Sequence, residues 1–473
     1  MEMPPKTSAF LRLFTITVFI ILASIDNCVL DMASSVYWAM EDVFGLDRPD
    51  FLGFVNSLLI WIVAGLSVLW GFWGDKGNRK RLLLVGTLIW SGSLILTPLV
   101  LNAIFWLVVQ CIAGIGLACI ASVGFSIIVD FVAPERRGMA LGFWGLSQGL
   151  GTAVGKAVAA ILVKEASGWW QPFFIFSLVG FGMIGLYFFT LDPKRGATEK
   201  ELKDVDYDYK IKGADFIFIF KNKTNILIML TGMIGQIFWG SLTWLPYIFT
   251  QKFRDQGLTD YAAGFAGNIV AGLFAIGGIF SIPIGWFTDK LLKRTQVARP
   301  LVAGVFSLAG IPLFVLMLLI PFNLSALAGV SDTFGIINGL LYQLGNNPPF
   351  LAMFLVSVGA SAMLSATAPN WFALIGDVNL PEHRGTMFGL ANLINGVGRG
   401  IGSLFLPVIA SAFLLLYPEP INYLWSIIIA LLFFIPMGIL CLVGCWTVRS
   451  DYNKVKETLA RRAEEFKART KER

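Results

Sequence analysis

Long apolar stretches alternate with short polar ones along nearly the whole chain. An α-helix rises about 1.5 Å per residue, so about 20 apolar residues are enough to cross the hydrocarbon core of a bilayer. Twelve stretches are of this order of length, at residues 10–37, 51–74, 82–102, 104–129, 138–163, 170–191, 224–250, 262–288, 300–321, 350–376, 385–416 and 420–448. The pattern predicts an all-α membrane protein with twelve transmembrane helices.

The first apolar stretch superficially resembles a secretory signal, because Lys6 and Arg12 precede it. It is longer than the core of such a signal, which is about 7–15 residues, and no small-residue cleavage site precedes Asp26. We therefore expect a retained first helix.

The longest polar interruption divides the apolar stretches six and six. It covers residues 192–223 and carries eight cations and seven acids. We expect an N-terminal half at 1–191, a cytoplasmic linker at 192–223, a C-terminal half at 224–448 and a charged helical tail at 449–473.

The two halves are repeats of one another. A shift of 247 residues aligns 130–155 with 377–402 without a gap, and ten of the 26 positions are identical. Many secondary transporters consist of such six-helix repeats around a central site. The second half carries 33 more residues between its equivalent aspartates, and we expect them in an external loop near 323–347.

The distribution of Lys and Arg predicts the orientation. Of the 36 cations, 30 lie in segments on the side of both termini and four on the other side, while Lys156 and Arg399 fall within helices. Both termini are therefore expected in the cytoplasm, in a multi-pass protein of the cell (plasma) membrane. The net charge of +6 follows from this topology and does not indicate a nucleic-acid partner.

Composition narrows the chemistry further. The chain is 56% hydrophobic and 14% charged, its five cysteines lie in apolar stretches, and its one histidine, His383, lies in a loop. No nucleophile arrangement, metal-ligand cluster or nucleotide motif is present. We expect no enzyme activity, no cofactor and no metal.

A charged loop after the second stretch recurs in the second half. It reads Gly71-Phe-Trp-Gly-Asp75-Lys76-Gly-Asn-Arg79, and its counterpart is Gly285-Trp-Phe-Thr-Asp289-Lys290. The motif resembles the signature loop of the major facilitator superfamily of secondary transporters. That resemblance implies a major facilitator fold, whose halves these loops latch in one state. The expected latch residues are Gly71, Asp75, Lys76, Arg79, Asp289 and Lys290, with the repeated Asp130, Arg137, Asp377 and Arg384.

Within that superfamily, short motifs resemble the Spinster-like branch. They are Ile25-Asp26, Asn78-Arg79-Lys80, residues 192–197 and Asn370-Trp371. Spinster-like proteins are associated with export of sphingolipid and lysophospholipid species. Their fourth helix carries an Arg and a Glu, where this chain has Gln110 and Leu117.

Four charged residues lie deep within predicted helices, where an unpaired charge costs at least about 2.5–3.5 kcal/mol. They are Asp26, Asp31, Lys156 and Arg399. Counting residues from the cytoplasmic ends of their helices matches Asp26 with Arg399 and Asp31 with Lys156. Two interpretations remain open: fixed ion pairs, or titratable and substrate-binding pairs that face a water-filled cavity.

Two amides, Gln148 and Asn395, occupy equivalent positions in the repeat. They suit either a polar substrate group or hydrogen bonds between helices. With the four charged residues they form the predicted substrate and coupling site. We expect a monomeric secondary transporter of a small organic solute, anionic or amphipathic and lipid-like, coupled to an ion gradient such as that of protons. The alternative is a membrane sensor or scaffold on the same fold.

Overall fold

A computed structural model describes residues 5–76, 78–124, 137–191 and 219–471, without some side chains, among them those of 137–148 and 459–471. Every regular element in these ranges is helical. Eleven helices of the described part are long and apolar enough to cross a membrane, and Gly149–Leu162 of α7 is a shorter apolar helix. The helices coincide with the twelve predicted stretches and confirm the all-α membrane class.

The described part of the N-terminal group contains six long helices and one short one. Five of the long helices contain one unbroken α-helical segment each, and a π-helical turn, Ile120–Gly124, extends the remaining one, α5. The bounds are α1 Pro5–Asp31, α2 Tyr37–Phe44, α3 Asp50–Lys76, α4 Arg79–Leu94, α5 Ala103–Cys119, α7 Arg137–Leu162 and α8 Gln171–Tyr187.

Several of the predicted stretches of the C-terminal group consist of two successive helices. These pairs are α10 Lys223–Ser241 with α11 Leu245–Asp255, α12 Asp260–Ile276 with α13 Ser281–Leu292, α16 Pro348–Ser365 with α17 Thr367–Asp377, and α19 Ile421–Leu432 with α20 Phe434–Lys471. The other helices are α14 Ala298–Leu319, α15 Thr333–Asn346 and α18 Pro381–Phe413.

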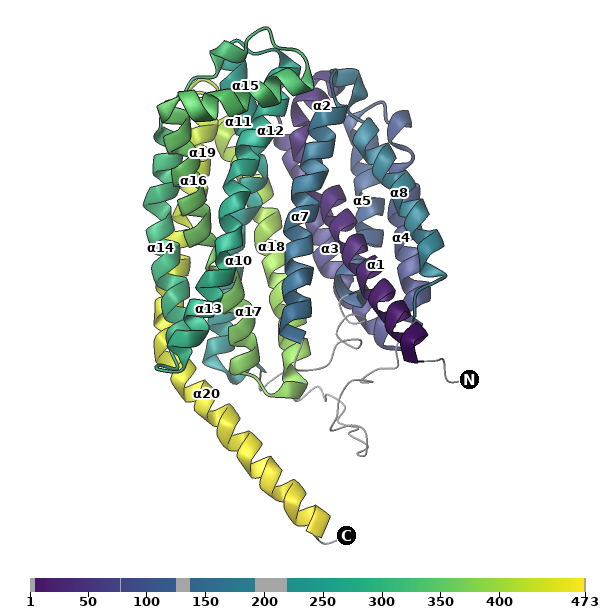
Figure 1. The fold of residues 1–473 in the computed structure, drawn as a ribbon, viewed down its shortest axis with the longest axis vertical. Coiled ribbons are helices and arrows are strands. Elements are labelled where there is room, and N and C mark those ends of the chain that lie inside the picture. The colour runs from purple at the N-terminus through teal and green to yellow at the C-terminus, as the bar shows by residue number, and fades with distance from the viewer. Residues whose placement is uncertain (1–4, 77, 125–136, 192–218, 472–473) are drawn as a thin grey trace.

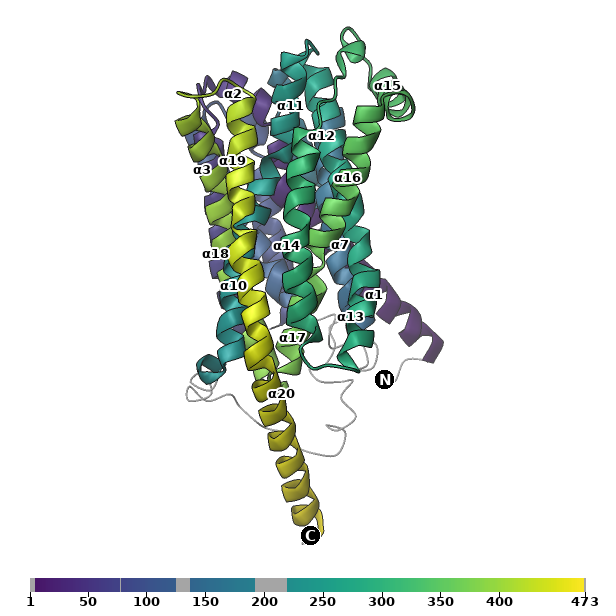
Figure 2. The same cartoon turned by 90° about the vertical axis from the view of Figure 1, so that its left-hand side faces the viewer.

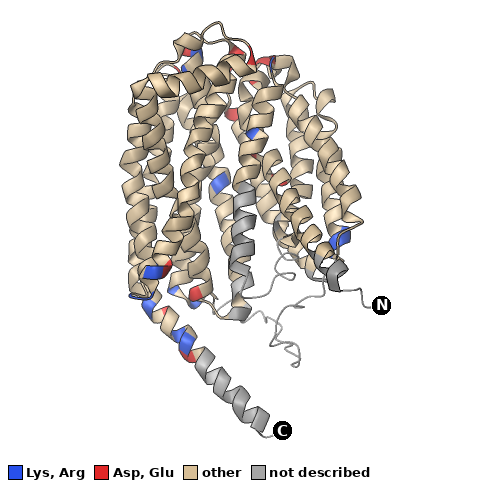
Figure 3. Cartoon of the chain, viewed as in Figure 1, with Lys and Arg blue, Asp and Glu red and all other residues tan. Residues whose placement is uncertain are grey.

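The long helices form one upright bundle, with both chain termini at the same end (Figures 1 and 2). We call this the proximal end and the opposite one the distal end. Charged residues of the described part gather at the two ends, and few lie between them (Figure 3). This is the distribution expected when the middle of the bundle lies in hydrocarbon.

Two short distal helices were not predicted. Helix α2 continues the first apolar stretch, and α15 occupies the region of the second half expected to be an external loop. The N-cap residue of α15, Asp332, accepts a hydrogen bond from the backbone N–H of Gly335 at 2.7 Å. Ile336 and Leu340 are buried, one turn apart. In the sequence, one N-cap residue and one short apolar face do not stand out from the Gly and Asn residues of this segment. Helix α15 was therefore not predicted.

Helix pairs repeat between the two groups. Helix α1 packs against α7 as α10 packs against α18, and α3 with α18 and α7 with α12 join the groups. The glycines of α7 and α18 permit the close approach within each group. A Cβ at Gly155 would meet Cys28 Cα at 2.6 Å, and one at Gly402 would collide with the carbonyl oxygen of Ile237. These glycines therefore allow the helices to pack closely.

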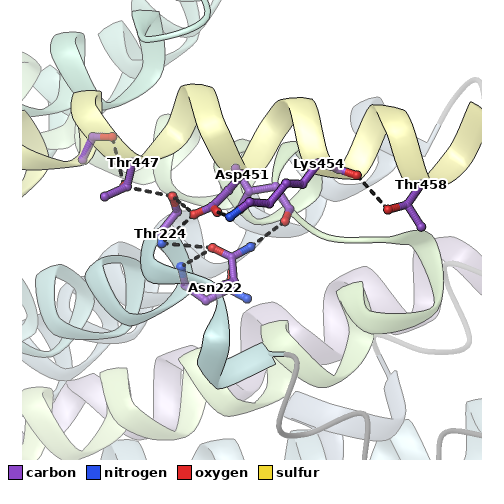
Figure 4. Close-up of polar contacts among 9 residues, drawn as sticks. Asn222, Thr224, Thr447, Asp451, Lys454 and Thr458 are labelled. Atoms are coloured by element: carbon purple, nitrogen blue, oxygen red, sulfur yellow. Dashed lines mark hydrogen bonds and ion pairs between the residues drawn. The ribbon is translucent and has the colours of Figure 1, made fainter.

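The last helix is joined to the start of α10 at the proximal end (Figure 4). The buried carboxylate of Asp451 accepts hydrogen bonds from Thr224 N at 3.1 Å and Thr224 Oγ1 at 2.8 Å. Asn222 Oδ1 accepts from the N–H groups of Thr224 and Asn225, as an N-cap. These bonds satisfy donors that a helix leaves free at its start.

Candidate functional site at the boundary of the two halves

An ion pair between α1 and α18 crosses the boundary between the two groups of helices. Arg399 Nη2 donates to Asp31 Oδ1 at 2.8 Å and to Oδ2 at 3.0 Å. Thr152 Oγ1, on α7, donates to Asp31 Oδ2 at 2.7 Å. The side chain of Asp31 is only 5% exposed, whereas that of Arg399 is 34% exposed. Asp31 is therefore enclosed, and its cationic partner can reach a solute.

A second cation lies next to this pair. Lys156 follows Thr152 by one helical turn on α7, so the two side chains share a face. Lys156 interacts electrostatically with both Asp31 and Arg399, but it is in no ion pair among the described residues. The described part of the site therefore holds two cations and one carboxylate.

The predicted pairing of these charges is wrong. Arg399 pairs with Asp31 and not with Asp26, and Lys156 is not in direct ion-pair contact with Asp31. Counting residues treats every helix as upright, but α1 runs obliquely (Figures 1 and 2). A tilted helix gains less height per residue, which brings Asp31, five residues beyond Asp26, to the level of Arg399.

Asp26 instead faces the interior of the N-terminal group. It is 5% exposed, and its Oδ1 has no hydrogen-bond partner among the described residues. Its electrostatic neighbours include Cys119 of α5 and Tyr187 of α8. The hydroxyl of Tyr187 lies 2.9 Å from Thr87 Oγ1 of α4. Asp26 is thus a buried acid, and these neighbours among the described residues are neutral.

The two predicted amides are Gln148 and Asn395. The side chain of Gln148 lies outside the described residues. Asn395 lies on α18, one turn before Arg399, and its Oδ1 is buried without a hydrogen-bond partner among the described residues. That oxygen faces Gly232 of α10, so it points toward a neighbouring helix of its own group.

Two of the residues predicted to form a latch, Asp289 and Asp377, lie together in the C-terminal group. Arg299, the second residue of α14, donates from Nε to Asp377 Oδ2 at 2.5 Å and from Nη1 to Asp289 Oδ1 at 3.0 Å. The two aspartates are among the predicted latch residues, and the arginine between them is not. Its signal was its place in the first turn of a helix after the charged loop.

The other residues predicted for the latch are described only in part. Arg79 is buried. A Cβ added to Gly71 would lie 3.7 Å from the side chain of Ser122. The Lys290 ammonium lies over the ring of Trp286, 5.4 Å from its centroid. The remaining predicted latch side chains lie outside the described residues: Asp75, Lys76, Asp130, Arg137 and Arg384.

The two groups are held together at the distal end and the centre. Hydrogen bonds that join described residues of both groups include Tyr247 Oη to Glu41 at 2.8 Å, Asn268 Nδ2 to Ser35 O at 3.3 Å, Asn56 Nδ2 to Ser403 Oγ at 2.7 Å and Ser411 Oγ to Asp50 at 2.5 Å. These bonds lie at the level of the Asp31–Arg399 pair or on its distal side. The distal end is therefore closed.

This architecture agrees with a family-level match. Residues 14–347 match the model of the Major Facilitator Superfamily. The chain belongs to the major facilitator superfamily. Its fold, its charged loops and its repeated halves thus have one explanation.

Relatives and solved structures within this superfamily are similar to the chain. A probable sulfoacetate transporter of Cupriavidus necator is 26% identical over 62% of this chain and 68% of its own length. Spinster homolog 1 of Xenopus laevis is 26% identical over 56% and 52%, and the sphingosine-1-phosphate transporter of Danio rerio is 24% identical over 57% and 55%. The chain spans about half the length of these two relatives.

The fold also matches solved transporters. An inward-facing, unoccupied bacterial homolog of the human lysosomal transporter Spinster superposes with a TM-score of 0.69 at 17% identity, covering 95% of this chain and 99% of that one. A nucleoside transporter, NupG, follows with a TM-score of 0.64 at 12% identity, covering 91% and 99%. This chain is an integral, multi-pass membrane protein of a superfamily of transporters, it has Spinster-like relatives, and its superfamily is not one of enzymes.

Proposed function

We propose that this transporter moves a small organic anion across the membrane by alternating access, with Arg399, Lys156, Thr152 and Asp31 as its binding site. Asp26 is the proposed proton-coupling residue. The halves rock about this site, the proximal loops latch one state, and the termini lie in the cytoplasm of a monomer in the plasma membrane. The relatives named for sulfoacetate and sphingosine-1-phosphate, both anions, support the choice of solute class.

The observation that carries the proposal is the charge balance at the boundary. Among the described residues, Lys156 and Arg399 share one carboxylate, that of Asp31, so one positive charge has no direct partner there. An uncompensated charge within a membrane is costly. An anionic group on the solute supplies the missing charge.

The donors at the site are suited to an oxyanion. Arg399 uses Nη2 for Asp31, while its Nε is buried and has no hydrogen-bond partner among the described residues. A guanidinium can hold a carboxylate, sulfonate or phosphate through two parallel N–H donors. A solute oxyanion can therefore compete with Asp31 for Arg399 and loosen the bond between the two halves.

Binding and flux test this proposal directly. We would reconstitute the protein in liposomes and measure uptake and binding of sulfoacetate and of a lysophospholipid with a phosphate group. Lys156→Gln should weaken binding of the accepted anion at least about tenfold, which corresponds to about 1.4 kcal/mol. Lys164→Gln, which removes an exposed cation just beyond the same helix, is the matched control and should bind like the wild type.

Two outcomes would contradict the proposal. Equal loss in both lysine variants would mean that surface charge, not the site, governs binding. Tight anion binding without any flux would favour the sensor or scaffold role over transport.

A further inference from the structure

A glutamate at the distal end is held by a tyrosine of the opposite half. Glu41 lies on α2, and Tyr247 lies on α11. The hydroxyl of Tyr247 is 3.0 Å from Glu41 Oε1 and 2.8 Å from Oε2. Both helices lie at the distal end in Figure 1. This hydrogen bond therefore spans the boundary that must separate when the distal end opens.

Aromatic rings enclose the bond. Tyr247 is 3% exposed, and its ring packs edge-on against Trp244 and Tyr423 at centroid distances of 5.6 and 5.2 Å. Tyr37, one turn before Glu41, lies 4.6 Å from the ring of Trp244. The carboxyl group thus sits beside an apolar seam that water reaches poorly while the distal end is closed.

The charges that face Glu41 do not compensate this burial. Glu419, before α19, and Asp50, at the start of α3, add negative charge, while Arg254 of α11 adds positive charge. Arg254 is already in an ion pair with Asp260 at 2.8 Å. Desolvation by burial is the largest influence, and it raises the pKa of Glu41 from an ordinary 4.5 to about 8 despite the hydrogen bond from the tyrosine.

We propose that Glu41 is a proton-binding site that controls opening of the distal end. When the two halves separate there, water reaches the carboxyl group and favours its ionised form. When they close, the aromatic seam buries it and favours the protonated form. Tyr247 can donate to either form, so the hydrogen bond is present whenever the distal end is closed. The proton on Glu41 determines how stable that closed state is. This site lies apart from Arg399 and Asp26, and it rests on only the alternating-access part of the proposed function.

The direction of the pH effect follows from which state binds more protons. Between about pH 4.5 and 8 the closed state holds the proton on Glu41 and the open state releases it. Closure is therefore favoured as the pH falls through about 8, and opening as it rises. Within this window the ratio of the two states changes by at most about tenfold per pH unit.

Opening of the distal end can be measured without any solute, from how accessible a buried residue at the boundary becomes to a labelling reagent. Ser35 is 2% exposed, and its carbonyl oxygen accepts the hydrogen bond from Asn268 of the other half. A Ser35→Cys variant changes only the hydroxyl to a thiol. A membrane-impermeant maleimide on reconstituted protein should label it only when the distal end opens, after subtraction of the rate for the parent protein.

The labelling rate is compared with that in a Glu41→Gln background at each pH, so that the pH dependence of the thiol reaction cancels. The rate relative to Glu41→Gln should rise with pH, by up to about tenfold per unit. Asp42→Asn, which neutralises the exposed acid next in sequence, should keep the wild-type profile. Tyr247→Phe should label faster than the wild type at every pH.

If the labelling rate relative to Glu41→Gln does not change with pH, the two proteins have the same pH profile and the proposal is overturned. Thermal unfolding of each variant checks that it is folded. If Lys156→Gln loses anion binding but keeps the wild-type pH profile of labelling, Glu41 is confirmed as the controlling site. If labelling does not depend on pH but anion transport is intact, the proposal for Glu41 is refuted and the proposed transport function is not.

Discussion

Asp31 and Asp26 lie five residues apart on α1, yet their surroundings are opposite in kind. Asp31 lies at the boundary of the two halves, where Arg399 and Thr152 together donate three hydrogen bonds to it. Asp26 lies inside the N-terminal group, with a buried oxygen that has no hydrogen-bond partner among the described residues. About 140° of helix rotation separates them, which accounts for the two directions.

The difference places two buried carboxylates on one helix, one of them compensated by a cation and donors. Burying a carboxylate costs several kcal/mol unless a cation or donors compensate it. At Asp31 the compensation comes from the opposite half, so its stability depends on how the halves are arranged. At Asp26 nothing described compensates the charge, so a proton can do so. We therefore expect the first residue to govern binding and stability, and the second to govern coupling.

The largest effect should come from removing Arg399. Arg399→Ala leaves Asp31 buried without its cation, whereas Asp31→Ala/Arg399→Ala removes both charges. Breaking a buried pair from one side costs roughly 3–5 kcal/mol, and we expect the lower part of that range because the guanidinium is one-third exposed. Thermal unfolding of the purified protein should show a larger loss in the single variant than in the double.

The cycle also tests whether the two residues interact at all. Additive losses from Asp31→Ala and Arg399→Ala would show that the pair contributes nothing. Lys156→Ala serves as the comparison, because it removes a neighbouring cation that is in no ion pair among the described residues, and it should cost less.

The next effect concerns coupling at Asp26. Asp26→Asn keeps the shape of the side chain but cannot ionise, so the free energy of unfolding should be unchanged or higher. Accumulation driven by a pH gradient should be lost, whereas exchange of solute across the membrane should persist. Uptake by proteoliposomes with and without the gradient, beside counterflow, separates the two.

Asp47→Asn, at an exposed acid of the loop before α3, provides the control for this measurement and should accumulate normally. Continued uphill accumulation in Asp26→Asn would make Asp26 a structural residue and place coupling elsewhere.

The membrane architecture could be predicted because it follows from the length of apolar stretches. All twelve have a helical counterpart, since an isolated backbone in hydrocarbon must satisfy its own hydrogen bonds. Short helices such as α2 and α15 gave too weak a signal. The break between α10 and α11 also went unpredicted, although Pro246 near the start of α11 is compatible with it.

The site could be predicted by residue type but not by partner. A charge within an apolar stretch is visible in sequence, and Asp31 and Arg399 were both named. Their pairing depends on the tilt and rotation of α1, which packing between distant helices determines. Arg299 was missed for a related reason: its aspartate partners lie 10 and 78 residues away, and only the fold brings them together.

The smallest effect should come from ion pairs that water reaches, which extends the comparison to a third environment. Arg299 is 12% exposed, Asp377 26% and Asp289 63%. Exposed pairs contribute about 0–1 kcal/mol because solvent screens them. Asp289→Asn should therefore change unfolding by less than about 1 kcal/mol, and Asp377→Asn by more.

The transport rate should nevertheless fall in both variants, since the latch acts on one conformation and not on folding. Lys80→Gln is the informative comparison. Lys80 is the second residue of α4, as Arg299 is of α14, but its Nζ donates to the carbonyl oxygens of Phe188 at 3.1 Å and Thr190 at 3.0 Å. Neutralising it removes no carboxylate partner, so we expect a milder loss of rate. Wild-type rates in both aspartate variants, measured at equal protein density in proteoliposomes, would refute the latch.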